Sequence, residues 1–318
     1  MMISLRDRLE NGQVVIYFAA VCIAATAATA LRGTEHLEPA INPALALMLF
    51  VTFLQVPLAS LRQAFRNGRF FGVLLAVNFA AVPTLVMILA QFAPPEPLVR
   101  LGFLIVLLCP CIDYVVTFSH LGRADARLLL AATPVLLIVQ MLLLPLWLSL
   151  FLGTQAAELV QMGPFLHAFL WLIAVPLGLA ALCQLWSARS AAGARVTEAL
   201  GLLPVPATAL VLLIVIAAVV PQLGPALTTV LAVAPIYVAF AVIAPLLGWT
   251  IARLARLDAP ASRAVAFSGA TRNSLVVLPL ALAVPGAIPL VPAVIVTQTL
   301  VELVASLIYI RMMPRLGA

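Results

Sequence analysis

The stretch LGFLIVLLCPCIDYVVTFSHL, residues 101–121, decides the fold expected for this chain. It is long and apolar enough to cross a bilayer as an α-helix, which takes about 20 residues. Its middle, however, contains Cys109-Pro110-Cys111 followed by Asp113. A proline inside a helix leaves carbonyl groups unpaired, and in lipid these must be met by neighbouring helices, a cavity or a ligand. Because an ionisable residue at this depth also marks functional sites, we expect an interrupted helix that belongs to a transport site.

The whole chain has the composition of a polytopic membrane protein. Of its 318 residues, 65% are hydrophobic and 9% are charged, and the mean hydropathy is +1.21. Apolar runs of spanning length recur at about 13–31, 41–60, 70–92, 98–121, 128–152, 164–187, 200–221, 226–252, 262–284 and 289–312. They predict an all-α protein of about ten transmembrane helices with no soluble domain. We interpret the first run as a span, since it lacks the cleavage site of a signal peptide.

The positions of the basic residues predict the orientation in the membrane. They are all arginines, and they gather at both termini and in every second connection: Arg6, Arg8, Arg62, Arg66, Arg69, Arg123, Arg127, Arg189, Arg195, Arg253, Arg256, Arg263, Arg311 and Arg315. The alternate connections carry only Arg32 and Arg100, beside glutamates. By the positive-inside rule both termini are cytoplasmic, in a plasma (inner) membrane, and the number of spans is even. The net charge of +6 therefore indicates topology and not nucleic-acid binding.

The two halves of the chain resemble each other. The run PALAL at 43–47 opens the second span, and PATAL at 206–210 opens the seventh. Gln140 in the fifth span is matched by Gln298 in the tenth, each at the same distance after a proline. Five spans per half is an odd number, so the two copies must have opposite orientations in the membrane. Such inverted repeats place the site of many secondary transporters at the midplane, between discontinuous helices.

The repeat pairs the interrupted fourth span with the ninth, which contains SGATRNS at 268–274. A run of small and polar residues that includes a full charge cannot form a lipid-facing helix, so we expect this span to be broken as well. If the two breaks cross, half-helix N-termini favour an anion there and C-termini favour a cation. Within one membrane domain, 1–190 then holds the first five-span repeat plus span six, and 191–318 completes the second repeat.

Three charged residues are predicted at mid-membrane depth: Asp113, Arg272 and Glu302. Each costs at least about 2.5–3.5 kcal/mol to insert. Arg272 can pair with either carboxylate to hold the halves together, but one negative charge is then left over. The remaining carboxylate must bind a cation or carry a proton, because burial and like charge both disfavour its ionisation. Our hypothesis is that Glu302, Asp113 or both couple transport to an ion or a proton.

The two cysteines beside Pro110 admit two interpretations. A thiolate is a soft ligand for thiophilic metals and, by the same chemistry, for trivalent arsenic or antimony. Buried cysteines also serve as small hydrophobic residues. Cys111 is the better candidate ligand because it directly follows the break, with Cys109 as a further residue of the path. The spacing does not fit a structural metal site, and a disulfide framework is not expected.

Uncharged polar residues of the same spans either line a polar path or hydrogen-bond between helices. They are Asn78, Gln140, Thr271, Asn273, Ser274 and Gln298.

The chain contains no nucleotide-binding loop, catalytic triad or cofactor fingerprint. It is therefore expected to be neither an ATP-driven pump nor an enzyme, and to need no cofactor or resident metal.

With these features the chain resembles the bile acid:sodium symporter superfamily over nearly its whole length, and within it the arsenite efflux transporters. The similarity depends on a cysteine at the break of span four, here Cys111, and a glutamate in the middle of span ten, here Glu302. The Asn-containing break at 270–274 is similar as well. In the arsenite branch this resemblance implies that the cysteine takes part in arsenite handling and that efflux is coupled to proton entry.

The chain departs from both branches of that superfamily. Arsenite exporters usually have an arginine before the cysteine, where this chain has Pro110, and an acidic residue where it has Val276. Arg272 would supply the positive charge from the opposite helix, and Asp113 the acid. Sodium-coupled members carry a Glu and a Gln at positions matching Ser268 and Arg272. A guanidinium there would repel sodium, so sodium coupling is not expected.

The sequence therefore predicts a secondary active exporter of arsenite or a related metalloid oxyanion that exchanges it for protons by alternating access. Cys111 would contact the substrate with Asn273 and Ser274 as polar ligands, Arg272 would be a fixed charge at the site, and Asp113 with Glu302 would be the coupling acids. The alternative is a transporter of a small organic anion, sodium- or proton-coupled, with Arg272 as the carboxylate clamp. An intramembrane enzyme using Asp113, or a receptor, is disfavoured because paired acids and a signalling domain are absent. The partners expected are the substrate and the lipid bilayer, with homo-oligomers left open.

Overall fold

The computed structural model describes residues 5–55, 67–112, 114–153, 167, 170–221, 226–282, 284, 286–287 and 289–317. Within these ranges every element of regular secondary structure is a helix. The described residues contain six helices that are long and apolar enough to cross a membrane, or seven if one bent pair counts as a single span. The predicted class, an all-α polytopic membrane protein, is therefore confirmed. The full number of spans stays a prediction.

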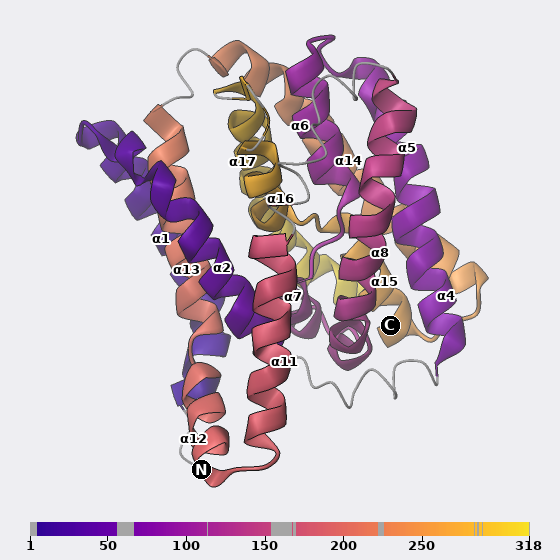
Figure 1. The fold of residues 1–318 in the computed structure, drawn as a ribbon. Helices are drawn as coiled ribbons and strands as arrows, with labels where there is room; N and C mark the ends of the chain where they lie inside the picture. Colours follow the sequence, from indigo (N-terminus) through magenta and orange to yellow (C-terminus); the bar gives the residue numbers. More distant parts are fainter. Residues whose placement is uncertain are drawn as a thin grey trace.

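One group of helices, which we call the panel, lies on the left of Figure 1. It consists of α1 (Leu5–Ala30), η1 (Thr34–Leu37), α2 (Glu38–Gln55), η4 (Leu170–Ala174), α11 (Val175–Ser187), α12 (Ala191–Leu200) and α13 (Pro204–Val219). Helix α1 packs on α13, and α2 packs on both α13 and α11. The bent pair is α12 and α13, which meet at 42°. Pro204 begins α13, where its missing N–H needs no intrahelical partner.

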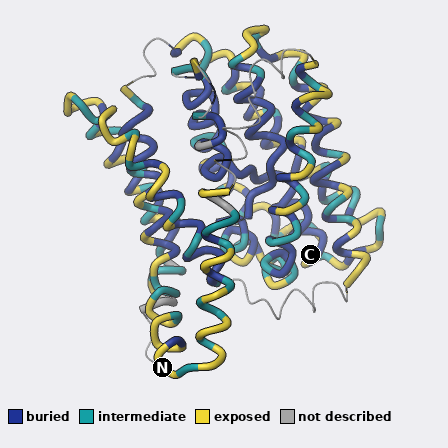
Figure 2. Tube along the Cα trace, viewed as in Figure 1, coloured by how far each residue is buried: buried dark blue, intermediate teal, exposed yellow. Residues whose placement is uncertain are grey.

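The second group, the core group, fills the right of Figure 1. It consists of α4 (Gly68–Ala76), η2 (Val77–Ala81), α5 (Val82–Leu89), η3 (Ala90–Phe92), α6 (Pro97–Leu108), α7 (Val115–Leu121), α8 (Ala126–Leu152), α14 (Leu227–Leu254), α15 (Ala259–Ala270), α16 (Ser274–Leu282), α17 (Leu290–Met312) and η6 (Met313–Arg315). Helix α14 packs on α15 and α17, and α6 packs on α17 and α8. Buried residues concentrate in this group (Figure 2), and every residue of α15 from Ala261 to Ala270 is buried. Large apolar side chains such as Val15, Leu142 and Leu231 are exposed, as expected for surfaces that face lipid.

Prolines within the long helices show how this fold handles freed carbonyl groups. Pro245 lies inside α14 without ending it. Because a proline has no N–H, the carbonyl of Ala241 loses its partner one turn earlier. The hydroxyl of Tyr309 in α17 donates to that carbonyl instead. A neighbouring helix thus keeps α14 continuous.

Connections that carry arginine come together at one end of the core group. The guanidinium of Arg263 donates to the carbonyl oxygen of Leu316 (3.0 and 2.9 Å) and to that of Arg123 (3.0 Å). The amide of Asp125 donates to the carbonyl of Pro260 at 3.0 Å. The start of α15, the turn between α7 and α8, and the C-terminal segment therefore lie on the same side.

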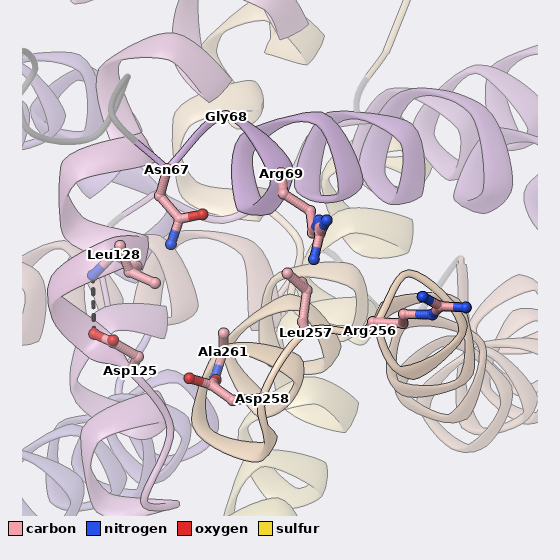
Figure 3. A pocket seen from close by; sticks show the side chains of 9 residues that line it. All are labelled: Asn67, Gly68, Arg69, Asp125, Leu128, Arg256, Leu257, Asp258 and Ala261. Atoms are coloured by element: carbon pink, nitrogen blue, oxygen red, sulfur yellow. Dashed lines mark hydrogen bonds between the residues drawn. The ribbon is translucent and has the colours of Figure 1, made fainter.

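A surface pocket of about 550 Å³ at this end joins a further arginine-bearing connection to the others. Figure 3 shows Arg69, Asp125, Arg256 and Asp258 around it. The two carboxylates act as helix N-caps, Asp125 accepting from the amide of Leu128 (3.1 Å) and Asp258 from that of Ala261 (2.9 Å). The clustering brings arginines of several connections to one end of the core group, and the side of the membrane that this end faces stays a prediction. Both carboxylates that line the pocket therefore have a structural role at the start of a helix. The pocket does not include Arg272 or Glu302, the charged residues within the spans.

Candidate functional site: the helix crossing

Two spans of the core group are interrupted, and their breaks meet. Helix α6 ends at Leu108 and α7 begins at Val115, while α15 ends at Ala270 and α16 begins at Ser274. The backbone segments at 109–111 and 271–273 cross near the middle of the molecule (Figure 1). Both interruptions were expected from Cys109-Pro110-Cys111 and from the polar run at 268–274, and the structure has both of them.

The crossing is held by backbone pairing in the manner of a very short antiparallel ladder. Pro110 lies opposite Arg272 in an isolated bridge. Two hydrogen bonds flank that pair: Cys111 N–H to Thr271 O at 3.1 Å and Asn273 N–H to Cys109 O at 2.8 Å. Pro110 therefore occupies the position of the ladder at which no donor is needed. This explains why a proline can sit at the centre of the crossing.

The side chain of Arg272 satisfies carbonyl groups that the breaks leave free. It is fully buried, and its guanidinium donates to four oxygen atoms: from Nη2 to Gly269 O (2.6 Å), Ser268 O (2.7 Å) and Asn78 Oδ1 (3.0 Å), and from Nη1 to Leu107 O (3.3 Å). The three backbone oxygens belong to the last turns of α6 and α15, where helix carbonyls lack intrahelical partners. The guanidinium carbon also lies 5.6 Å from the ring centroid of Phe240, within cation–π range.

Of the two carboxylates considered as partners of the Arg272 side chain, Asp113 lies outside the described residues and Glu302 makes a different contact. Among the described residues, the guanidinium forms no ion pair with a carboxylate. The carboxylate of Glu302 instead accepts the backbone N–H of Arg272 at 2.7 Å. The guanidinium is surrounded instead by three carbonyl oxygens from two helix ends, whose dipoles are negative there, and by the amide oxygen of Asn78.

The carboxylate of Glu302 joins α17 to both halves of the crossing. Besides the amide of Arg272, it accepts the hydroxyl of Tyr114 (2.7 Å) and the side-chain amide of Gln298 (2.5 Å). The Tyr114 hydroxyl also lies 3.5 Å from the carbonyl oxygen of Arg272. Glu302 itself is 3% exposed. A change in the protonation of Glu302 would therefore alter the hydrogen bond that its carboxylate accepts from the backbone of the crossing.

The other residues predicted for the site differ in the contacts that their polar side-chain atoms make. The Thr271 hydroxyl donates to the carbonyl of Phe267 in its own helix (2.8 Å). Cys109 and Cys111 are fully buried and contain no disulfide in the described structure. Gln140 is fully buried too, and neither of its amide atoms has a hydrogen-bond partner among the described residues. Asp113 lies outside the described residues.

Asn273 and Ser274 present unpaired polar atoms at the start of α16. Both residues are 1% exposed. Neither amide atom of Asn273 nor the hydroxyl of Ser274 has a hydrogen-bond partner within the part of the chain that the structure describes. A buried polar group without a partner costs about 1–3 kcal/mol, so native proteins keep one where a ligand or water meets it. The N-terminus of a helix additionally favours a negatively charged group.

Sequence reasoning overlooked Tyr114 and understated Asn78. Tyr114 adjoins the break, but nothing in the sequence shows that its hydroxyl reaches Glu302. Asn78 was included only as one polar residue of a path, whereas its amide oxygen is a partner of Arg272. It lies in the π-helix η2, an irregularity common at functional sites and invisible in the hydropathy pattern.

Comparison with known families places this geometry in context. The model of the Sodium Bile acid symporter family matches residues 42–229, more than half of the chain. The chain belongs to this family. As a sodium bile acid symporter family member it is a secondary transporter and not an enzyme. The matched range includes α6 and α7 but ends before α15, α16 and α17. No curated protein matches the chain.

Proposed function

We propose that this chain is a sodium-independent exporter that exchanges arsenite or a related metalloid oxyanion for protons. The observation that carries the proposal is the composition of the crossing. It brings together a buried cysteine, unpaired polar atoms at a helix N-terminus and one hydrogen-bonded carboxylate, while its cation-attracting carbonyls are already used by Arg272.

Cys111 is the proposed contact for the metalloid. Its amide donates to the carbonyl oxygen of Thr271 in the bridge between the two broken helices, two residues from Asn273, whose side-chain amide atoms are unpaired among the described residues. Trivalent arsenic and antimony share the preference of soft metals for thiolates. In this proposal the thiol displaces one hydroxyl group of arsenous acid, which leaves as water with the thiol proton, while Asn273 and Ser274 hydrogen-bond to the remaining oxygen atoms; the reverse step releases the substrate. Cys109, on the same bridge, and Gln140, Gln298 and Thr271 belong to the proposed path.

Glu302 is the proposed coupling acid. Its three hydrogen bonds all come from N–H or O–H donors, and such bonds are stronger to a carboxylate than to a neutral acid. Protonation would therefore weaken the link between α17 and the crossing. We assign Asp113 as a second acid of the same path, on the sequence alone.

The two packing groups support alternating access as the proposed mechanism. The crossing lies entirely in the core group, and the panel meets that group mainly where α2 contacts α16 and α13 contacts α17. We propose that the core group rocks against the panel and so exposes the crossing to each side in turn. The same proposal includes ten spans in two inverted repeats, divided as 1–190 and 191–318, with both termini cytoplasmic in the inner membrane.

Counterflow in proteoliposomes tests this function. We expect labelled arsenite to accumulate in vesicles preloaded with arsenite, equally with and without sodium, and small carboxylates not to compete. Cys111→Ser should reduce this exchange at least about tenfold, because it removes the only soft ligand proposed to contact the substrate. Equal exchange by Cys111→Ser, or exchange that depends on sodium, would contradict the proposal.

A second candidate substrate is a small organic anion. The observation in its favour is the start of α16, where the unpaired atoms of Asn273 and Ser274 lie at the positive end of a helix dipole. Arg272 is a poor clamp for such a carboxylate, since both terminal nitrogens of its guanidinium already donate to protein oxygens. In the counterflow experiment this candidate predicts competition by carboxylates and a harmless Cys111→Ser.

A further inference from the structure

The oxygen atoms around Arg272 form a cluster of the kind that binds small cations. We call Leu107 O, Ser268 O, Gly269 O and Asn78 Oδ1 the oxygen cluster. All four accept hydrogen bonds from one guanidinium, at 2.6–3.3 Å. Converging carbonyl oxygens replace the hydration shell of an alkali cation in channels and transporters. The positively charged group that meets them here belongs to the protein itself.

The electrostatics of the cluster come from the two broken helices. Leu107 lies in the last turn of α6, and Ser268 and Gly269 lie in the last turns of α15. Each helix end bears about half a negative charge from its unpaired carbonyls, so two ends attract a cation jointly. Full burial strengthens that attraction, because water does not screen it.

Asn78 completes the cluster in a fixed orientation. Its amide nitrogen donates to the carbonyl of Leu74 (3.0 Å) and to the hydroxyl of Ser268 (2.9 Å). With both N–H groups used in this way, the amide oxygen must face the guanidinium. The side chain therefore contributes an acceptor and not a donor, as a cation requires.

We infer that the guanidinium of Arg272 is a tethered cation occupying a site that would otherwise bind a free alkali cation, and that it makes this transporter independent of sodium. Because the guanidinium is covalently attached, it occupies the site throughout the transport cycle. Sodium then does not bind there, and a sodium gradient does not drive transport through this site. The inference deepens the sodium-independent coupling proposed above and rests on it for its physiological meaning. Its binding test involves no transported substrate.

The test is thermal unfolding of the purified, detergent-solubilised variant Arg272→Ala in sodium, potassium or choline chloride at equal ionic strength. A cation that binds only the folded state raises the unfolding temperature. We expect a rise of several degrees in sodium or potassium relative to choline, and a similar rise in methylguanidinium, which restores the missing group. The wild type should unfold at one temperature in all these salts.

Three control variants make the test specific. Arg272→Lys retains a tethered cation and should not respond to sodium. The double variant Arg272→Ala/Asn78→Leu loses one ligand of the oxygen cluster, so its response should be reduced. Arg263→Ala removes a mostly buried arginine that also donates to carbonyl groups, at the loop end of α15, and should show no preference for sodium over choline.

Equal unfolding temperatures of Arg272→Ala in all salts would overturn the inference. If that variant cannot be recovered in choline, the yield of monodisperse protein in each salt replaces the unfolding temperature. Higher recovery in sodium, potassium or methylguanidinium supports the tethered cation, and equally poor recovery in all of them contradicts it. Failure of arsenite exchange by the wild type would overturn the proposed substrate and leave this result standing.

Discussion

The two sides of the helix crossing are built from the same broken helices but are completed differently. On one side, the carbonyl groups at the ends of α6 and α15 are met by the guanidinium of Arg272. On the other side, α16 begins at Ser274, directly after Asn273, and the polar side-chain atoms of both residues have no partner among the described residues. We call these the filled side and the open side.

The difference separates the structural and functional roles of one motif. The filled side stabilises the crossing, because three carbonyl groups at the ends of α6 and α15 find a donor there. An open side costs free energy in the absence of a ligand, and a substrate that supplies hydrogen bonds recovers that cost. Glu302 contacts the crossing itself, since its carboxylate accepts the backbone amide of Arg272. We therefore expect substitutions on the two sides to separate stability from transport.

The largest expected effect is on the filled side. Arg272→Leu leaves the four acceptors of the oxygen cluster without their donor and should lower the free energy of unfolding by more than the roughly 1–3 kcal/mol expected for a single unpaired buried acceptor. Thermal unfolding in detergent measures this loss. Tyr309→Phe is the matched control, because it uncaps only the Ala241 carbonyl and should cost about 1–3 kcal/mol. Equal losses for the two variants would remove the special role of the filled side.

The next effect concerns Glu302, whose carboxylate accepts the backbone amide of Arg272. Glu302→Gln keeps a side-chain acceptor for the amide of Arg272 but cannot exchange a proton. We expect arsenite counterflow to continue, while uptake driven by a pH gradient falls at least about tenfold, which corresponds to about 1.4 kcal/mol. Parallel flux measurements in one vesicle preparation make the comparison. Full gradient-driven uptake by this variant would exclude Glu302 as the coupling acid.

The smallest effect on stability is expected on the open side. Ser274→Ala removes a buried hydroxyl that has no partner among the described residues, so no protein hydrogen bond in them is lost. The free energy of unfolding should stay within about 0.5 kcal/mol of wild type or rise slightly. The same unfolding assay measures it. A loss as large as that of Arg272→Leu would show that this side is structural after all.

The sequence was enough to predict the interruptions but not their hydrogen bonding. Pro110 leaves carbonyl groups unpaired, and the polar run at 268–274 cannot form a lipid-facing helix. Both breaks and their crossing were therefore predictable. The depth of Arg272 and Glu302 followed from hydropathy in the same way. Their partners did not, because formal charge alone suggests that the two side chains pair. The preference of Arg272 for carbonyl oxygens depends on where two helices end, and that is a property of the folded backbone.

The contacts made by Tyr114 and Asn78 show the same limit. Each reaches a partner far away in sequence, Glu302 and Arg272 respectively. A single sequence carries hydropathy and local turn signals, but not the side-chain directions that bring such residues together. The π-helix η2 is a further case, since its wider turn leaves no pattern in the residues that form it.

Transport by the double variant Asn273→Leu/Ser274→Ala tests the central claim most directly, namely that the open side of the crossing binds the substrate. The variant is reconstituted beside wild-type protein, and counterflow of labelled arsenite is measured after its unfolding temperature has been shown to match that of wild type. We predict exchange reduced at least about tenfold, the effect of losing roughly 1.4 kcal/mol of substrate binding. Exchange at the wild-type rate by a stable double variant would contradict the claim.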